Sequence, residues 1–214
     1  MYSPKTNMKY LAQIMVKTHP MRFGDRFWSI FDEVIKPDLS KEPVIFDLGT
    51  GPGLFLKDLR ERINKAKLYG YDSSKEMISV ARNINPKDSK IKFEIKDIAG
   101  KSFRFPQKDI NLITINFTFH HINYPVPLLE AIRCSLGKKR GFLLVYDWIR
   151  SSLKTYLEFH QFLQNDVSPE TLYSRFTEHN RYSPDDIKWL LSENQFNVIK
   201  IEKLTDMHCL FICR

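Results

Sequence analysis

The sequence predicts an α/β fold in which a doubly wound, mostly parallel sheet ends in an antiparallel hairpin. Two observations indicate it. Apolar runs of strand length alternate with segments of helical periodicity, which is the pattern of βαβ units. The last two apolar runs are separated only by a short turn, expected at Thr205-Asp206, and strands joined in this way must run antiparallel.

The expected strands are the apolar runs bounded by polar or turn-forming residues. Those of the parallel part are Val44–Leu48, Leu68–Tyr71, Ile91–Ile95, Ile110–Asn116 and Gly141–Asp147, and those of the hairpin are Phe196–Leu204 and Met207–Cys213. With 214 residues, 43% of them hydrophobic, the chain is long enough to bury a sizeable core, so we expect one domain over residues 1–214.

Capping signals mark the expected helix starts. Ser73 stands three residues before Glu76, the spacing of a capping box, and predicts a helix from about Ser74 to Asn83. Ser168-Pro169-Glu170 and Ser183-Pro184-Asp185-Asp186 each supply a hydroxyl at the cap, then a proline, then carboxylates where the helix dipole favours them. A fourth helix is expected to begin at Pro125 and Pro127 and to run to about Leu136.

The composition argues against a secreted or membrane-spanning protein. Cys134, Cys209 and Cys213 fit neither a disulfide framework nor a zinc site, and no stretch approaches the ~18 apolar residues of a membrane span. We therefore expect a cytoplasmic protein. The 33 Lys and Arg against 25 Asp and Glu, a net charge of +8, leave RNA open as a partner. Because the longest basic run is only Lys138-Lys139-Arg140, a solvated basic surface is favoured.

A glycine-rich turn follows the first expected strand, in the string Asp47-Leu48-Gly49-Thr50-Gly51-Pro52-Gly53. Glycines let the backbone turn sharply and approach a ligand closely, and the N–H groups that open the next helix can face a phosphate or a carboxylate. A dinucleotide fingerprint starting at Gly49 would require glycine at position 54, which is Leu54, so the register disfavours a nicotinamide cofactor. The alternative is a purely structural tight turn.

Further candidate ligand groups stand at the ends of the next strands. Asp72 ends the second strand, where a carboxylate can accept both hydroxyls of a ribose. Asp97-Ile98 follows the third strand and offers a carboxylate for an exocyclic amine and an apolar side chain for an adenine face, with Met77 available for the other side of the ring. Taken singly, Asp97 reads as a loop or capping residue and Met77 as a core residue.

With these motifs the sequence resembles the class I S-adenosylmethionine (SAM)-dependent methyltransferases, in particular the small-molecule group similar to the ubiquinone and menaquinone biosynthesis enzymes. The resemblance extends from about Val44 to Asp147. It rests on Val44-Ile45-Phe46-Asp47-Leu48-Gly49-Thr50-Gly51-Pro52-Gly53, Tyr71-Asp72-Ser73-Ser74-Lys75-Glu76-Met77-Ile78, Asp97-Ile98 and Asn116-Phe117-Thr118-Phe119-His120-His121. It implies a Rossmann-like fold with SAM as cofactor and S-adenosylhomocysteine as product.

The resemblance also implies positions for the cofactor. Its methionine part would lie along Gly49, Gly51 and Gly53, its ribose hydroxyls on Asp72, and its adenine beside Asp97 and Ile98. Asn116 would stand near the methionine end. Many family members carry glutamate in place of Asp47, whose shorter side chain keeps the charge but would reach the amino group through a water. The other cofactor-binding residues expected from the same motifs are Thr50, Ser73, Met77 and Phe117.

The residues expected to act on the acceptor are His120, His121 and Asp147. An imidazole at the end of the fourth strand can take a proton from a hydroxyl, an amine or an activated carbon. The alternative is that a histidine of the pair orients the loop by hydrogen bonding. No third ligand at a recognisable spacing accompanies the pair, so no metal is expected. Asp147 either contacts substrate or caps the helix that follows.

The segments that flank the cofactor-binding core, residues 44–147, are expected to be helical lids. They cover residues 1–40 and 148–182, and residues 183–214 form a closing helix and the hairpin. Aromatic side chains at helical spacing are usually core residues, but here they lie in the regions that the resembled family uses to build its acceptor pocket. The candidates for an acceptor pocket, which favour an apolar or aromatic substrate, are Arg22, Phe23, Phe27, Trp28, Phe31, Tyr156, Phe159, His160, Phe162, Tyr173 and Phe176.

The function expected from these features is methyl transfer from SAM to a small-molecule acceptor. One alternative is an RNA methyltransferase, which the net charge of +8 favours. Against it, no Asn-Pro-Pro-Tyr-type tetrad follows the fourth strand, where Asn116-Phe117-Thr118-Phe119 stands instead. Another alternative is a SAM-binding protein without catalysis that assists a partner.

Overall fold

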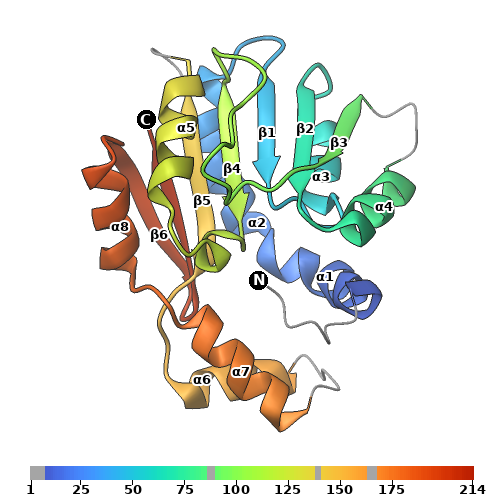
Figure 1. Cartoon of the computed structure of the whole chain (residues 1–214), viewed down its shortest axis with the longest axis vertical. Coiled ribbons are helices and arrows are strands. Elements are labelled where there is room, and N and C mark those ends of the chain that lie inside the picture. The colour runs from blue at the N-terminus through green and yellow to red at the C-terminus, as the bar shows by residue number, and fades with distance from the viewer. Residues whose placement is uncertain (1–7, 86–89, 138–140, 163–167) are drawn as a thin grey trace.

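The computed structural model describes residues 8–85, 90–137, 141–162 and 168–214, without the side chain of Phe162. Its centre is a seven-stranded sheet in the order β3-β2-β1-β4-β5-β7-β6 (Figure 1). The strands are β1 (Val44–Leu48), β2 (Lys67–Asp72), β3 (Ile91–Ile95), β4 (Leu112–Asn116), β5 (Phe142–Trp148), β6 (Val198–Thr205) and β7 (His208–Cys213). The first five pair in parallel and the last two antiparallel, so the expected fold class is confirmed.

The strand order reverses on either side of β1, which pairs with β2 on one edge and with β4 on the other. Ligands of open α/β sheets bind at such a switch point, beyond the carboxyl ends of the strands. In Figure 1 this end of β1 points towards α1 (Met8–Arg22). The topology thus places the turn after β1 at the position where a ligand is expected.

The C-terminal hairpin enters the sheet with its second strand. β7 lies between β5 and β6, and every one of its residues is buried because its side chains alternate between the hydrophobic clusters on the two faces of the sheet. The connecting turn falls at Asp206-Met207, one residue later than expected. Thr205 instead continues β6, opposite His208, and its Oγ1 accepts the Met207 N–H at 3.2 Å, which closes the turn from the strand end.

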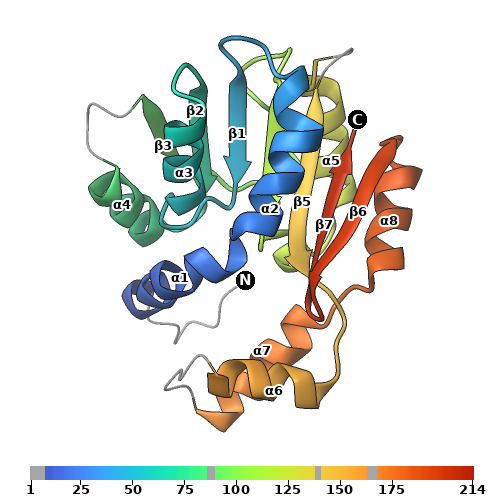
Figure 2. The same cartoon turned by 180° about the vertical axis from the view of Figure 1, so that it is seen from behind.

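Helices cover both faces of the sheet. α5 (Val126–Ser135) and α8 (Pro184–Glu193) lie in front of it in Figure 1, whereas α2 (Asp25–Ile30) and α3 (Leu54–Arg62) lie in front in Figure 2, seen from behind. α6 (Leu153–Phe162) and α7 (Pro169–His179) pack together beyond the carboxyl end of β5. α4 (Lys75–Ile84) and three short segments, η1 (Phe31–Ile35), η2 (Lys36–Asp38) and η3 (Phe119–His121), complete the described elements.

Two of the three capping predictions are confirmed and one is wrong. Ser168 and Ser183 cap α7 and α8, and Ser183 forms a reciprocal capping box with Asp186. α4, however, is capped by Ser74, whose Oγ accepts the Met77 N–H at 3.1 Å. The helix begins one residue later than the box at Ser73 implies because Asp72 accepts the Ser74 N–H and holds it outside the helix.

The segment expected as an N-terminal lid divides into two parts. α2 and η1 bury Phe27, Ile30, Phe31 and Ile35 in the same hydrophobic cluster as side chains of β1, β4 and β5. α1 instead packs on α4 through a small separate cluster that contains Leu11, Ala12 and Met77. Only α1 therefore lies in the position of a lid, because residues 25–35 are part of the core.

Candidate functional site

The glycine-rich turn after β1 is built from left-handed backbone. Gly49, Gly51 and Gly53 have φ angles of 73°, 53° and 73°, values that other residues rarely adopt. The N–H groups of Gly49 and Thr50 donate to the carbonyl oxygen of Tyr71 at 2.8 and 2.9 Å, so β2 holds the start of the turn in place. The turn then leads into α3.

Gly49 and Gly51 differ in what surrounds the position of a Cβ atom. A Cβ at Gly49 would lie 2.1 Å from Oγ1 of Thr118, so the loop after β4 fills that volume. A Cβ at Gly51 would meet no atom closer than Sδ of Met15, at 3.5 Å. Gly51 therefore exposes its backbone to a cavity between the turn and α1, where a ligand can approach it.

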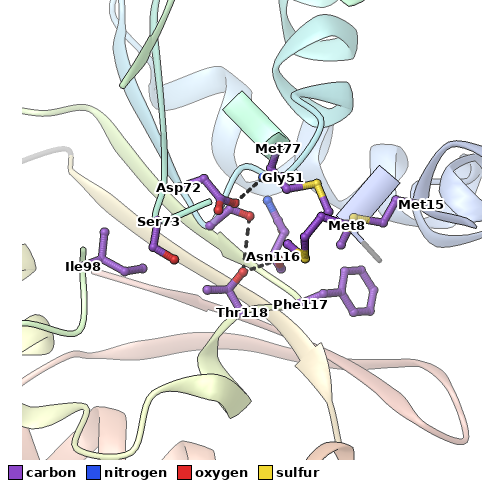
Figure 3. A pocket seen from close by; sticks show the side chains of 11 residues that line it. Met8, Met15, Gly51, Asp72, Ser73, Met77, Ile98, Asn116, Phe117 and Thr118 are labelled. Carbon is purple, nitrogen blue, oxygen red and sulfur yellow. Dashed lines mark hydrogen bonds between the residues drawn. The ribbon is translucent and has the colours of Figure 1, made fainter. Parts of the chain in front are cut away.

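That cavity has a volume of about 100 Å³ and collects residues from α1, the turn, β2, α4 and the loop after β4 (Figure 3). The expected cofactor-binding residues that line it are Gly49, Gly51, Asp72, Ser73, Met77, Ile98, Asn116 and Phe117. Sequence reasoning missed Met8, Met15 and Thr118. The missed methionines lie on a helix far away in sequence, and no local pattern marks them.

Asp72 is held by backbone amides on both carboxylate oxygens. Its Oδ2 accepts the Gly51 N–H and its Oδ1 the Ser74 N–H, each at 2.8 Å. Burial raises the pKa of Asp72, while these two amides favour the charged form. Each oxygen retains a lone pair, so the carboxylate can still accept hydroxyls from a ligand in the cavity.

Asp47 lies beneath the turn rather than in the wall of the cavity. It is 2% exposed, and its Oδ1 accepts Oγ1–H of Thr114 at 2.6 Å and Nδ2–H of Asn116 at 3.0 Å. Burial raises the pKa of Asp47 to about 6. Asn116, which lines the cavity, leaves its own Oδ1 buried without a hydrogen-bond partner among the described residues. A ligand that carries hydrogen-bond donors would fit this end of the cavity.

The other expected cofactor residues lie outside the cavity wall. A Cβ at Gly53 would lie 2.7 Å from the Phe93 ring, so this glycine serves the packing of α3 on the sheet. Thr50 is buried within the turn. Asp97 is exposed and its Oδ1 accepts the Ala99 N–H at 3.0 Å, the geometry of a loop-forming aspartate. Of the pair Asp97-Ile98, only Ile98 reaches the cavity.

His120 and Asp147 form a buried pair behind the loop after β4. Nδ1 of His120 lies 2.5 Å from Oδ1 of Asp147, and the side chains are 2% and 1% exposed. Asp147 also accepts the backbone N–H groups of His120 and Trp148. The carboxylate fixes the imidazole, and the other ring nitrogen, Nε2, is enclosed without a hydrogen-bond partner among the described residues.

Asp147 therefore does not cap the helix that follows, and this alternative is wrong. α6 begins at Leu153, and the Thr155 N–H donates to Oγ of Ser152 at 3.1 Å, which identifies Ser152 as its cap. Asp147 is the penultimate residue of the buried strand β5 and lies too early in the chain to cap α6. Its carboxylate oxygens are directed at the loop after β4 instead.

His121 faces a different partner. Its Nδ1 lies 2.7 Å from Oε1 of Glu178 on α7, and its ring centroid is 3.9 Å from that of His120. Burial lowers the pKa of His121 below its ordinary value, although Glu178 opposes the shift. Sequence reasoning missed Glu178, which lies 57 residues from His121 and carries no motif.

Aromatic and imidazole rings extend from the loop after β4 towards α6 and α7. His179 stacks on Trp148 with centroids 4.3 Å apart, and its Nδ1 lies 3.1 Å from the hydroxyl of Tyr156. His208 lies 4.2 Å from Trp148 and 5.2 Å from Phe117. Among the expected pocket aromatics, Phe23, Phe27, Trp28 and Phe31 are core residues, Tyr173 is exposed, and the side chain of Phe162 falls outside the described residues.

Other expected features are located as follows. No group of three or more His, Cys, Asp or Glu among the described residues could hold a metal ion. Within the same residues, no helix combines the length and apolar character needed to cross a membrane. The basic run Lys138-Lys139-Arg140 falls outside the described residues.

Comparison with known families identifies the family of the chain. The family described as Methyltransferase domain matches residues 22–201, most of the chain. The chain belongs to this family. The expectation of a SAM-dependent methyltransferase is thereby confirmed. No curated protein sequence matches the chain significantly.

Solved structures agree on the fold. A SAM-dependent methyltransferase from Aquifex aeolicus is 20% identical, with a TM-score of 0.68 over 100% of this methyltransferase and 98% of that chain. The Haloferax volcanii protein in complex with the Trm112 methyltransferase activator is 16% identical, with a TM-score of 0.67 over 99% and 98%. The plantazolicin methyltransferase BpumL, in complex with a substrate analogue and S-adenosylhomocysteine, is 19% identical, with a TM-score of 0.65 over 98% and 86%.

Proposed function

We propose that this methyltransferase transfers the methyl group of SAM to a small-molecule acceptor of apolar or aromatic character. The observation that carries the proposal is the position of the buried His120–Asp147 pair. Along the chain His120 follows Asn116, Phe117 and Thr118, which line the cavity at the switch point of the sheet, while its own side chain is buried outside the cavity wall. A group with a fixed imidazole thus stands next to the cofactor cavity.

The cofactor would be held by the residues that surround the turn. Asp72 accepts the ribose hydroxyls, while Gly51 leaves room for the methionine part and Asn116 offers its unpartnered oxygen. Met77 and Ile98 supply apolar contacts to the adenine. Asp47, buried behind Asn116, contributes negative charge towards the amino group. When bound, SAM supplies a methyl group made electrophilic by its sulfonium.

The contribution of the chain to the reaction is orientation and proton transfer. Asp147 accepts the Nδ1 proton of His120 and so keeps the neutral imidazole in the tautomer whose Nε2 bears a lone pair. That nitrogen takes the proton that the acceptor's hydroxyl, amine or carbon loses as it is methylated. The loop after β4 holds the acceptor opposite the methyl group, which lowers the entropic part of the barrier.

The acceptor character follows from the rings beside this loop. Burial lowers the pKa of His160 to about 4 and of His208 to about 3, and it lowers that of His179 well below its ordinary value. These imidazoles are therefore neutral near pH 7. Together with Trp148 and Phe117 they form a largely buried, mostly aromatic cluster, with the Arg22 guanidinium 4.6 Å from the centroid of the Phe117 ring. This composition favours an apolar or aromatic acceptor.

Two measurements test the proposal. Calorimetry should show micromolar binding of SAM and S-adenosylhomocysteine, weakened about tenfold or more in Asp72→Asn through loss of a charge-assisted acceptor. Asparagine is preferred to alanine because Asp72 also holds the Gly51 N–H. Tritium transfer from labelled SAM into a small-molecule extract should then exceed transfer into RNA. Binding of NADH without SAM, or label found only in RNA, contradicts the proposal.

A further inference from the structure

The end of α7 and the residues that follow it make consecutive contacts with the core. Glu178 accepts from His121, and His179 stacks on Trp148. Oδ1 of Asn180 accepts the Ser151 N–H at 2.7 Å. Arg181 donates from Nη1 to the carbonyl oxygen of His120 at 3.1 Å, and also to Asn123. Residues 178–181 therefore contact both the loop after β4 and the chain that follows β5.

The contact with Glu178 selects the tautomer of the His121 imidazole. A carboxylate on Nδ1 selects the neutral tautomer that carries its proton there, as Asp147 does for His120. Two neighbouring imidazoles are thus held by carboxylates from different elements. His120 is fully enclosed, whereas the side chains of His121 and Glu178 are 16% and 31% exposed. The second pair is the accessible one.

His121 continues towards the cofactor cavity through hydrogen bonds. Its backbone N–H donates to the carbonyl oxygen of Thr118 at 3.0 Å, and Oγ1 of Thr118 lies 3.3 Å from the carbonyl oxygen of Gly49. Thr118 and Gly49 both line the cavity. A continuous path of contacts joins Glu178 to the glycine-rich turn.

We propose that Glu178 is a positioning residue, and that the path Glu178–His121–Thr118–Gly49 couples occupation of the cofactor cavity to the packing of α7. This coupling rests on the proposed function, because it requires the cavity to bind SAM or its product. The glycine-rich turn and the loop after β4 share one volume at Gly49, so a ligand that settles the turn also settles Thr118 and η3. Glu178 then transmits that order to α7.

Hydrogen exchange with S-adenosylhomocysteine tests the coupling. In the wild type the ligand should slow exchange at residues 49–53, at 119–123 and in the last turn of α7, each by at least about threefold. Glu178→Ala should keep the protection at 49–53 but lose it in α7. Glu178→Gln, which keeps an oxygen acceptor, should restore most of it. Glu158→Gln is the matched control, because that side chain on α6 is 61% exposed and pairs only with Lys154 among the described residues.

The tautomer of His121 provides a second readout that needs no ligand. Nitrogen-15 NMR should show Nδ1 protonated in the wild type and in Glu178→Gln, and a mixture of tautomers in Glu178→Ala. Protection of the turn without protection of α7 in the wild type would overturn the coupling, and mixed tautomers in the wild type would overturn the positioning role. Absence of protection at 49–53 would instead contradict the cofactor site itself. If Glu178→Ala fails to fold, the wild type and Glu178→Gln decide both points.

Discussion

Asp47 gives the cofactor site a titratable group within the physiological range. Its carboxyl is buried against Thr114 and Asn116, and its pKa is raised from 3.8 to about 6 because burial disfavours the charge. In the proposed site the amino group of SAM would lie near Asp47 and favour its carboxylate form, so we expect the cofactor to bind best when Asp47 is ionised. Below pH 6 the carboxyl is neutral and this contribution disappears.

We therefore expect the affinity for SAM to fall as the pH drops through about 6, by up to about tenfold per pH unit. Calorimetry between pH 5 and 8 measures this affinity, and Asp47→Asn should bind SAM more weakly at pH 8 and lose the pH dependence.

The stability of the free protein should depend on pH in the opposite sense. Because the folded state holds the proton more tightly between pH 3.8 and about 6, its stability should decrease as the pH rises through that window. A flat binding profile in the wild type would remove Asp47 from the site.

Replacement of His120 and of Asp147 tests the catalytic role proposed for this pair. His120→Ala should lower turnover by ~10²–10⁴ with little change in SAM affinity, since the role proposed for the imidazole concerns the acceptor and not the cofactor. Asp147→Asn should lower turnover as well, because a neutral amide no longer supplies the negative charge that stabilises the imidazolium formed when His120 takes a proton. Radiolabelled transfer and calorimetry measure the two quantities separately. Unchanged turnover in His120→Ala would contradict a catalytic role for this histidine. Loss of SAM binding in both His120→Ala and Asp147→Asn would indicate that the His120–Asp147 pair has a structural role.

At the scale of elements, we expect α1 to be dispensable for folding. It contributes Met8 and Met15 to the cavity and packs through a small cluster of its own, whereas α2 belongs to the main core. Removal of residues 1–20 should leave a folded protein that binds SAM at least about tenfold more weakly, because water enters the site. Removal of residues 1–40 should abolish folding, since Phe27 and Phe31 are buried in the main core.

Circular dichroism and calorimetry check these two truncations. Val16→Ala is a matched control, because that side chain on α1 is 45% exposed and lies outside the cavity wall. If the shorter truncation binds SAM as tightly as the intact chain, α1 has no part in retaining the cofactor.

Sequence patterns predicted the elements whose signals are local. Ser168 and Ser183 cap their helices because hydroxyl, proline and carboxylates lie within four residues. The start of α4 was misplaced by one residue, since the choice between Ser73 and Ser74 depends on the contact with Asp72. The position of β7 between β5 and β6 depends on pairing between distant segments, which periodicity does not encode.

The candidate site divides in the same way. Gly49, Asp72 and Asn116 follow strands in recognisable strings, so their meeting at one edge of the sheet could be predicted. Met15 and Glu178 reach the site from helices far away in sequence. Their residue types are ordinary for amphipathic helices. Only the packing of α1 and α7 gives them a role.

At the scale of the whole molecule, the net charge of +8 favours contact with nucleic acid. We expect such contact to be weak and to disappear between low and physiological salt, because a diffuse basic surface binds by releasing counterions. Filter binding to bulk cellular RNA across that range measures it, and an unrelated protein of similar charge is the control. Sub-micromolar binding that persists at physiological salt, together with methyl groups in the RNA, would overturn the small-molecule assignment.

The volume shared by Gly49 and Thr118 constrains how this chain can evolve. Any side chain at position 49 meets Thr118 and must also adopt a φ near 73°, so two independent costs oppose it. Shortening Thr118 removes only the first, and the left-handed backbone still costs about 1–2 kcal/mol. No single step therefore opens a mutational path away from glycine. Position 118 is freer, but each larger residue there closes further options at 49, so the two loops should drift as an epistatic pair rather than as separate sites.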